Sequence, residues 1–203
     1  MIFLKYIAHR GVFSDKTKEN TIESFYLAIK DNRFVGFELD IRVSKDNNFF
    51  VYHDYLLKGK PFKNYFTNEL KDLNIPTLES VLNIGHNKIV LIEIKDFDID
   101  VKKFLKLLDG YPDRKIYVMS FSNKVIEKIA KESKKYKLGI LDYILNSDYN
   151  YKYSFICLLN SLIDEEVIRN YKNKNIEVMS YGIFKKQEIK FDGIYYIVDS
   201  DKI

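Results

Sequence analysis

Apolar residues fall in short blocks along the chain, and most blocks alternate with segments whose apolar residues recur every three or four positions. The short blocks predict strands at residues 3–8, 34–44, 49–53, 89–95, 116–119, 136–141, 153–159, 176–181 and 193–198. The periodic segments predict helices at residues 21–31, 76–82, 98–108, 123–133, 164–173 and, in a short form, 184–189. Repeated strand–helix units without a linker indicate a parallel sheet in a single domain, residues 1–203.

The order of these units favours a compact, closed (β/α)8 TIM barrel, whose chemistry lies at the carboxyl ends of the strands. Nine strands are one too many, so residues 49–53 are interpreted as the hairpin partner of residues 34–44. Because 203 residues is close to the lower size limit of this fold, several helices must be short or missing. Asn20 and Glu23 resemble a capping box at the start of the first helix.

Composition narrows the class of protein. The formal charge of +4 is spread over lysines that alternate with acids, which is typical of a solvated surface and argues against a nucleic-acid partner. The single cysteine, Cys157, lies in an apolar run and is expected to be buried and inert. No run approaches the roughly 18 apolar residues of a membrane span. We therefore expect a cytoplasmic protein without stable membrane insertion, although it could make transient contact with a membrane surface. The sequence does not indicate the oligomeric state.

Two carboxylates on one predicted strand suggest a cation site. Glu38 and Asp40 are two residues apart, so their side chains leave the same face about 6.6 Å from each other. Glu93 lies near the end of a later strand and is a candidate third ligand. Buried carboxylates repel one another unless a cation neutralises them, and all-oxygen ligands suit Mg²⁺ or Ca²⁺.

Two of the three histidines lie beside these acids. If the hairpin turn is centred between positions 46 and 47, Asp40 lies opposite His53, at a distance of roughly 5 Å. His9 ends the first apolar run, and Arg10 next to it could bind a phosphate through two hydrogen bonds. Lys95 could hold a phosphate oxygen as a point charge. Histidines that titrate near neutrality, a cation site and fixed positive charge are what phosphodiester cleavage needs.

Each feature alone also has a structural explanation. A carboxylate pair on a strand is most often exposed, and a role as a helix cap is enough to explain Asn20. His86 in a polar loop is interpreted as a surface residue. The acids at positions 96, 98 and 100 favour a solvated helix start over a metal site. The tyrosine-rich segment 143–153 could line the mouth of the barrel or an oligomer contact.

The joint order of the motifs closely resembles the glycerophosphodiester phosphodiesterase family, in the superfamily of PI-PLC-like phosphodiesterases. The resemblance is specific over residues 7–95 and looser beyond. The matching stretches are Ile7-Ala8-His9-Arg10-Gly11, Glu19-Asn20-Thr21, Gly36-Phe37-Glu38-Leu39-Asp40-Ile41, Ser44-Lys45-Asp46, Val51-Tyr52-His53-Asp54, Ile75-Pro76-Thr77-Leu78-Glu79, Leu91-Ile92-Glu93-Ile94-Lys95 and Ser120-Phe121. Lys18 stands where the family usually has proline, and the strand at 176–181 has no tryptophan, for which Tyr181 could substitute.

The resemblance implies a TIM barrel that hydrolyses small-molecule glycerophosphodiesters to glycerol 3-phosphate and an alcohol with one divalent cation, Mg²⁺ or Ca²⁺. It implies roles for seven residues: metal ligands Glu38, Asp40 and Glu93, acid–base pair His9 and His53, and phosphate-binding Arg10 and Lys95. The alternatives are a lysophospholipase D, a lyase that stops at a cyclic phosphate, and a non-catalytic barrel that binds a phosphate ligand.

Overall fold

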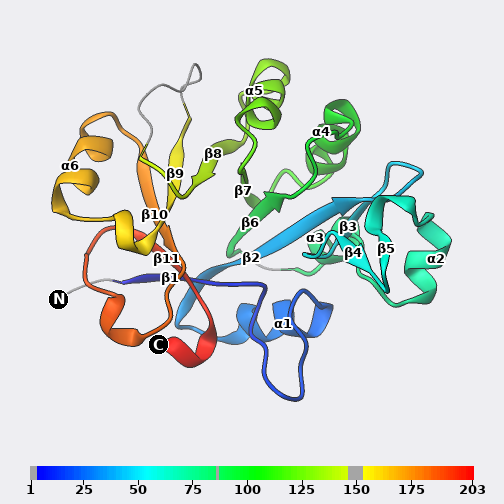
Figure 1. Ribbon diagram of the computed structural model, residues 1–203, viewed down its shortest axis with the longest axis horizontal. Coiled ribbons are helices and arrows are strands. Elements are labelled where there is room, and N and C mark those ends of the chain that lie inside the picture. The colour runs from blue at the N-terminus through cyan, green and yellow to red at the C-terminus, as the bar shows by residue number, and fades with distance from the viewer. Residues whose placement is uncertain (1–3, 86, 146–152) are drawn as a thin grey trace.

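The computed structural model describes residues 4–85, 87–145 and 153–203. Within these ranges, eight parallel strands form a closed barrel, because β1 pairs with both β11 and β2 at the two ends of the strand order. The barrel strands are β1 (Lys5–Ala8), β2 (Phe34–Val43), β6 (Ile89–Ile94), β7 (Lys115–Ser120), β8 (Lys137–Asp142), β9 (Phe155–Leu159), β10 (Glu177–Tyr181) and β11 (Tyr195–Val198). The predicted fold class is confirmed, and the chain forms a TIM barrel (Figure 1).

Helices cover the outside of the barrel, as Figure 1 shows. They are α1 (Ile22–Lys30), α3 (Leu78–Leu82), α4 (Val101–Asp109), α5 (Asn123–Glu132) and α6 (Glu165–Asn173). The expectation of short or missing helices is confirmed: α3 has 5 residues, and the segment between β10 and β11 contains only the 3-10 turn Lys186–Glu188. In the described ranges, none of the helices has the length and apolar character that a bilayer span requires.

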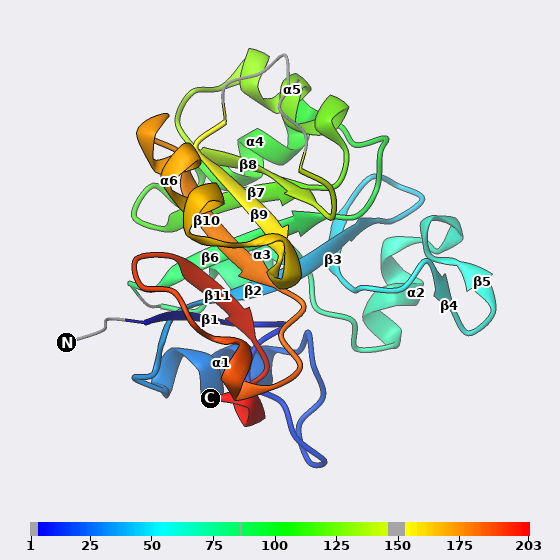
Figure 2. The ribbon, with the colours of Figure 1, turned by 60° about the vertical axis from the view of Figure 1, so that its left-hand side comes forward.

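A small insertion follows β2. It contains β3 (Phe49–Val51), which runs antiparallel to β2, the hairpin of β4 (Leu56–Leu57) and β5 (Lys60–Pro61), a 3-10 turn (Phe62–Asn64) and α2 (Thr67–Asp72). The interpretation of residues 49–53 as a hairpin partner is confirmed, whereas α2 was not predicted. In Figure 2 the arrows of β2 and β9 point toward the side where this insertion lies, so it borders the carboxyl-terminal face of the barrel.

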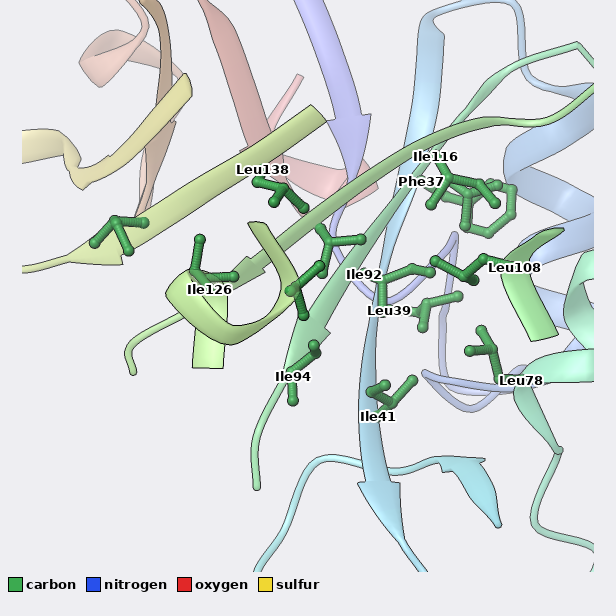
Figure 3. Packing of buried hydrophobic residues seen from close by; sticks show 14 of the residues in the cluster. Phe37, Leu39, Ile41, Leu78, Ile92, Ile94, Leu108, Ile116, Ile126 and Leu138 are labelled. Atoms are coloured by element: carbon green, nitrogen blue, oxygen red, sulfur yellow. The ribbon is translucent and has the colours of Figure 1, made fainter. Parts of the chain in front are cut away.

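Alternation along the strands separates two cores. Phe37, Leu39 and Ile41 of β2 and Ile92 and Ile94 of β6 point outward and pack against the helices (Figure 3). The intervening residues face the barrel interior, which is filled by Ile7, Ile89, Leu91, Tyr117, Met119, Leu141, Phe155, Cys157, Met179 and Ile197. Cys157 is fully buried, as predicted. Acids that share the inward register on β2 and β6 therefore lie on top of an apolar plug.

The starts of α1 and α4 differ from the predicted ones in a way that the capping side chains explain. The cap of α1 is Thr21, whose hydroxyl accepts a hydrogen bond from the Ser24 backbone N–H while Ser24 Oγ accepts one from the Thr21 N–H. The proposed pairing of Asn20 with Glu23 is wrong by one residue, because Asn20 has a left-handed φ of 54° and precedes the cap. Helix α4 begins at Val101 rather than 98, with Asp100 as its cap.

Candidate active site

Three carboxylates meet at the carboxyl ends of β2 and β6. Asp40 is directly paired with Glu93 in the parallel ladder, and Glu38 lies one inward position before Asp40. One oxygen from each of the three carboxylates lies within 4.8 Å of the others. The exposed fractions are 2% for Glu38, 1% for Asp40 and 7% for Glu93, so water screens these charges poorly. The structure thus brings together the three acids that the sequence analysis grouped.

Two cationic side chains lie against this triad. Arg10 Nε is 3.1 Å from Asp40 Oδ2, and the Arg10 backbone N–H donates to Glu38 Oε2 over 3.0 Å. Lys95 Nζ donates to Glu93 Oε1 over 2.7 Å and lies 3.5 Å from Asp40 Oδ1. By formal charge, three acids and two cations give the cluster an excess of one negative charge.

Each of the two predicted histidines contacts a carboxylate through Nδ1. His9 follows β1, and its Nδ1 is 2.8 Å from Asp199 Oδ1. His53 follows β3, and its Nδ1 is 2.8 Å from Asp54 Oδ1. A carboxylate accepts a hydrogen bond from Nδ1–H, so the neutral ring keeps the lone pair of Nε2 for proton transfer.

A pocket of about 160 Å³ joins these groups. Its charged side is lined by His9, Arg10, Glu38, His53, Glu93 and Lys95, and its apolar side by Met119, Phe121, Leu141, Tyr181 and Ile197. Both histidines and two of the three acids therefore face one small space at the mouth of the barrel.

The predicted register of the hairpin is wrong by one residue. Ile41 pairs with Val51, and the Tyr52 backbone N–H donates to the Asp40 carbonyl, so Tyr52 rather than His53 lies opposite Asp40. The loop between the strands has five residues, 44–48, instead of an even number, with Asn47 in the left-handed region at φ 60°. His53 reaches the pocket from the segment beyond β3 rather than from the ladder.

Two polar side chains of the site were not predicted to take part in it. Asn20 Nδ2 donates to Asp40 Oδ2 over 2.9 Å, so this residue orients the acid instead of capping α1. Asp199 is the first residue after β11, as His9 is after β1, and the ladder pairs Ala8 with Val198. An acid directly after the last predicted strand was the available signal. His86 lies outside the described residues.

The sequence profile of the glycerophosphoryl diester phosphodiesterase family matches residues 9–192. This chain belongs to that family. A glycerophosphodiester phosphodiesterase from Caldanaerobacter subterraneus subsp. tengcongensis is 30% identical over 160 residues, which cover 66% of this chain and 65% of that protein. The human lysophospholipase D GDPD1 is 29% identical over 147 residues, or 71% of this chain and 46% of the human one. The chain thus spans about half to two thirds of the length of these relatives.

A solved structure supports the family assignment along nearly the whole chain. The glycerophosphodiester phosphodiesterase from Thermotoga maritima is 26% identical, covers 96% of this chain and 94% of its own, and superposes with a TM-score of 0.75. The (β/α)8 barrel of this member of the glycerophosphoryl diester phosphodiesterase family is therefore shared with a structure of related sequence.

The electrostatics of the triad fit a bound cation. Burial is the largest cause that raises the pKa of Glu38 well above its ordinary value, followed by the charges of Asp40 and Glu93. Burial and the charge of Asp40 also raise the pKa of Glu93, and Lys95 opposes this. Arg10 Nε, which is buried near Asp40 without a hydrogen bond, is a donor and therefore suits an anion such as a phosphate rather than the cation. A hard dication bound between these acids would stabilise their ionised form, and carboxylate oxygens are the ligands that such a cation prefers.

Proposed function

We propose that this chain hydrolyses glycerophosphodiesters to glycerol 3-phosphate and an alcohol, by acid–base catalysis with two histidines. The observation that supports this most strongly is the single pocket that both histidines line together with Glu38, Glu93 and Lys95. Membership of the family supports the same reaction. The substrate is a small-molecule phosphodiester.

In this proposal Glu38, Asp40 and Glu93 hold one divalent cation, Mg²⁺ or Ca²⁺. When bound, the cation would polarise a phosphoryl oxygen and offset charge that develops on the phosphate. Arg10 and Lys95 supply the remaining positive charge. Arg10 is anchored by Asp40 and Glu19, whose Oε1 accepts from Arg10 Nη1 over 2.7 Å. Fixed charge of this kind is usually the largest contribution to such a reaction.

The histidines move the protons. One imidazole accepts a proton at Nε2 from the attacking oxygen, which belongs either to water or to the 2-hydroxyl of the glycerol. The second imidazole, protonated, gives a proton to the leaving alkoxide as the bond between phosphorus and the alcohol oxygen breaks. Attack by the 2-hydroxyl gives a cyclic phosphate, which water then opens. Asp199 and Asp54 each accept a hydrogen bond from Nδ1–H of a ring, which leaves Nε2 of one ring to accept a proton and Nε2–H of the other to give one.

The test is turnover of glycerophosphocholine by His9→Ala and His53→Ala, each expected to lose about 10²–10⁴-fold in kcat. Binding of Mg²⁺ and the melting temperature should stay close to those of the parent protein, because neither ring belongs to the acidic triad. His86→Ala is the matched control for loss of an imidazole that has no assigned part in the site. Near-normal activity in His53→Ala would refute the assignment.

A second candidate function is that of a lysophospholipase D, which the name of the human relative favours. It differs in the substrate, which then carries an acyl chain on the glycerol. Parallel assays with glycerophosphocholine and lysophosphatidylcholine, each with Mg²⁺, Ca²⁺ or chelator, separate the two. A preference for the lysophospholipid would replace the first proposal by the second.

A further inference from the structure

Three aromatic rings stand together beside the charged half of the pocket. Phe121 directly follows β7, Tyr143 directly follows β8, and Tyr181 is the last residue of β10. The ring centroids of Phe121 and Tyr181 are 6.3 Å apart with the planes at 86°, and those of Phe121 and Tyr143 are 6.0 Å apart at 47°. The three strands deliver these rings to one corner of the barrel mouth.

We propose that this corner is a subsite for a quaternary ammonium group, so that the preferred leaving alcohol is choline. The inference rests on the proposed phosphodiesterase function and names the alcohol that this function releases. Phe121 and Tyr181 line the same pocket as His53 and Lys95, so a group bound against these rings lies next to the phosphate site.

The rings contact one another and still offer exposed area. Phe121 and Tyr181 meet edge to face, with centroids 6.3 Å apart and planes at 86°. Phe121 is 43% and Tyr143 is 63% exposed, so part of each ring is open at the barrel mouth to a cation, which binds within about 6 Å of a ring centroid. Among the described residues, the lysines and arginines that stack on rings do so elsewhere, for example Lys5 on Tyr195. The faces of the corner are therefore not taken by a cation of the chain itself.

A carboxylate adds negative charge to the corner. Asp142 Oδ1 accepts hydrogen bonds from the backbone N–H groups of Tyr143, over 2.7 Å, and Ile144, over 3.0 Å. The Tyr181 hydroxyl donates to the Asp142 carbonyl over 3.3 Å, which ties the third ring to the same residue. Burial raises the pKa of Tyr181 to about 12, with a contribution from the Asp142 charge. The wall is thus un-ionised tyrosine and phenylalanine backed by an acid, which favours a cation over a neutral or anionic group.

The remaining wall selects among cations and alcohols. Met119, Leu141 and Ile197 present no hydrogen-bonding groups to the hydroxyls of glycerol or inositol, or to a primary ammonium. A hydroxyl or ammonium buried there without a partner costs free energy, whereas trimethylammonium has no hydrogen-bond donor to satisfy.

The experiment compares kcat/KM for glycerophosphocholine, glycerophosphoethanolamine and glycerophosphoglycerol. The parent protein should prefer the choline diester. Phe121→Leu and Tyr143→Leu should each lower the ratio of kcat/KM for the choline diester to that for the glycerol diester by about 2- to 30-fold, which is the range expected for one cation–π contact. The matched control is Phe97→Leu, an exposed ring beyond the end of β6 that takes no part in the ring contacts of Phe121; its ratio should be unchanged.

The outcomes separate the two levels of the proposal. Equal kcat/KM for the three diesters, or an unchanged ratio in both Phe121→Leu and Tyr143→Leu, would overturn the choline subsite and leave the phosphodiesterase function standing. No hydrolysis of any diester would overturn the function and the subsite with it. Tyr143 is 63% exposed, so its substitution leaves the core intact and tests the subsite even if Phe121→Leu fails to fold.

Discussion

The contact between Asp199 and His9 gives a quantitative prediction for Asp199→Asn. The two side chains meet over 2.8 Å with exposed fractions of 35% for His9 and 33% for Asp199. Hydrogen bonding to His9 is the largest cause that lowers the pKa of Asp199, so the acid is ionised at neutral pH. An asparagine amide can instead donate to Nδ1, which favours the imidazole tautomer with hydrogen on Nε2, and that tautomer cannot accept a proton there.

The size of the effect follows from burial. Hydrogen bonds to charged groups contribute about 1.5–3 kcal/mol, and partial exposure of the pair limits the loss to about 1.5–2.5 kcal/mol. This corresponds to a fall in kcat of about 10- to 70-fold. Asp54 is 68% exposed, twice as much as Asp199, beside a His53 that is 34% exposed, so it belongs with surface ion pairs. Asp54→Asn should therefore cost only about 0.2–1 kcal/mol, or 1.4- to 5-fold in kcat.

The assay is steady-state hydrolysis of glycerophosphocholine at saturating divalent metal, with the melting temperature of each variant measured alongside. The fall in kcat should come with little change in KM or melting temperature, because the contact acts on the orientation and tautomer of His9 and not on the core. If Asp54→Asn proved more damaging than Asp199→Asn, or if Asp199→Asn lost activity only by unfolding, the argument from burial would be wrong.

Three further predictions concern stability and reactivity. Mg²⁺ at about 100 times its Kd should stabilise the protein by about 2.7 kcal/mol, which corresponds to a rise of roughly 5–11 °C in melting temperature. Chelator should reverse this rise and Glu38→Gln should abolish it. An equal rise in Glu38→Gln would show that Glu38 is not a metal ligand. In urea unfolding, Asn20→Ala should lower the free energy of unfolding by about 1.5–3 kcal/mol more than Asn74→Ala does. Both asparagines have a left-handed φ, 54° and 57°, but only the Asn20 amide donates to the buried Asp40 carboxylate. Equal losses would mean that the hydrogen bond to Asp40 contributes nothing beyond the backbone effect. Burial raises the pKa of Cys157 well above its ordinary value, so an aromatic disulfide reagent should modify it only as fast as the protein unfolds, and rapid labelling of the folded protein would contradict its burial.

Much of the site was predictable because it depends on strand alternation and strand order. Glu38 and Asp40 share a face in any strand, and the carboxyl ends of adjacent parallel strands meet, so the approach of Glu93 followed once β2 and β6 were identified. The acidic triad needed no knowledge of loops.

Loop geometry and barrel closure limited the rest. The loop between β2 and β3 has five residues instead of an even number, which places Tyr52 rather than His53 opposite Asp40. The residue types at 44–48 do not indicate this loop length; only the backbone conformation does. The contact between His9 and Asp199 spans 190 positions and exists only because β1 pairs with β11 to close the barrel. Capping by Thr21 instead of Asn20 was decided by the competing hydrogen bond from Asn20 to Asp40.

The insertion after β2 has an apolar cluster of its own, formed by Phe50, Leu57, Phe62, Tyr65 and Leu70, apart from the two cores of the barrel. His53 lies between this small unit and the barrel, whereas His9 is fixed at the barrel rim. A unit with so little buried surface opens more readily than the barrel does. Activity should then fall on warming before the barrel unfolds. Amide hydrogens of residues 56–72 should exchange faster than those of β6, and equal rates would mean that the insertion and the barrel unfold together.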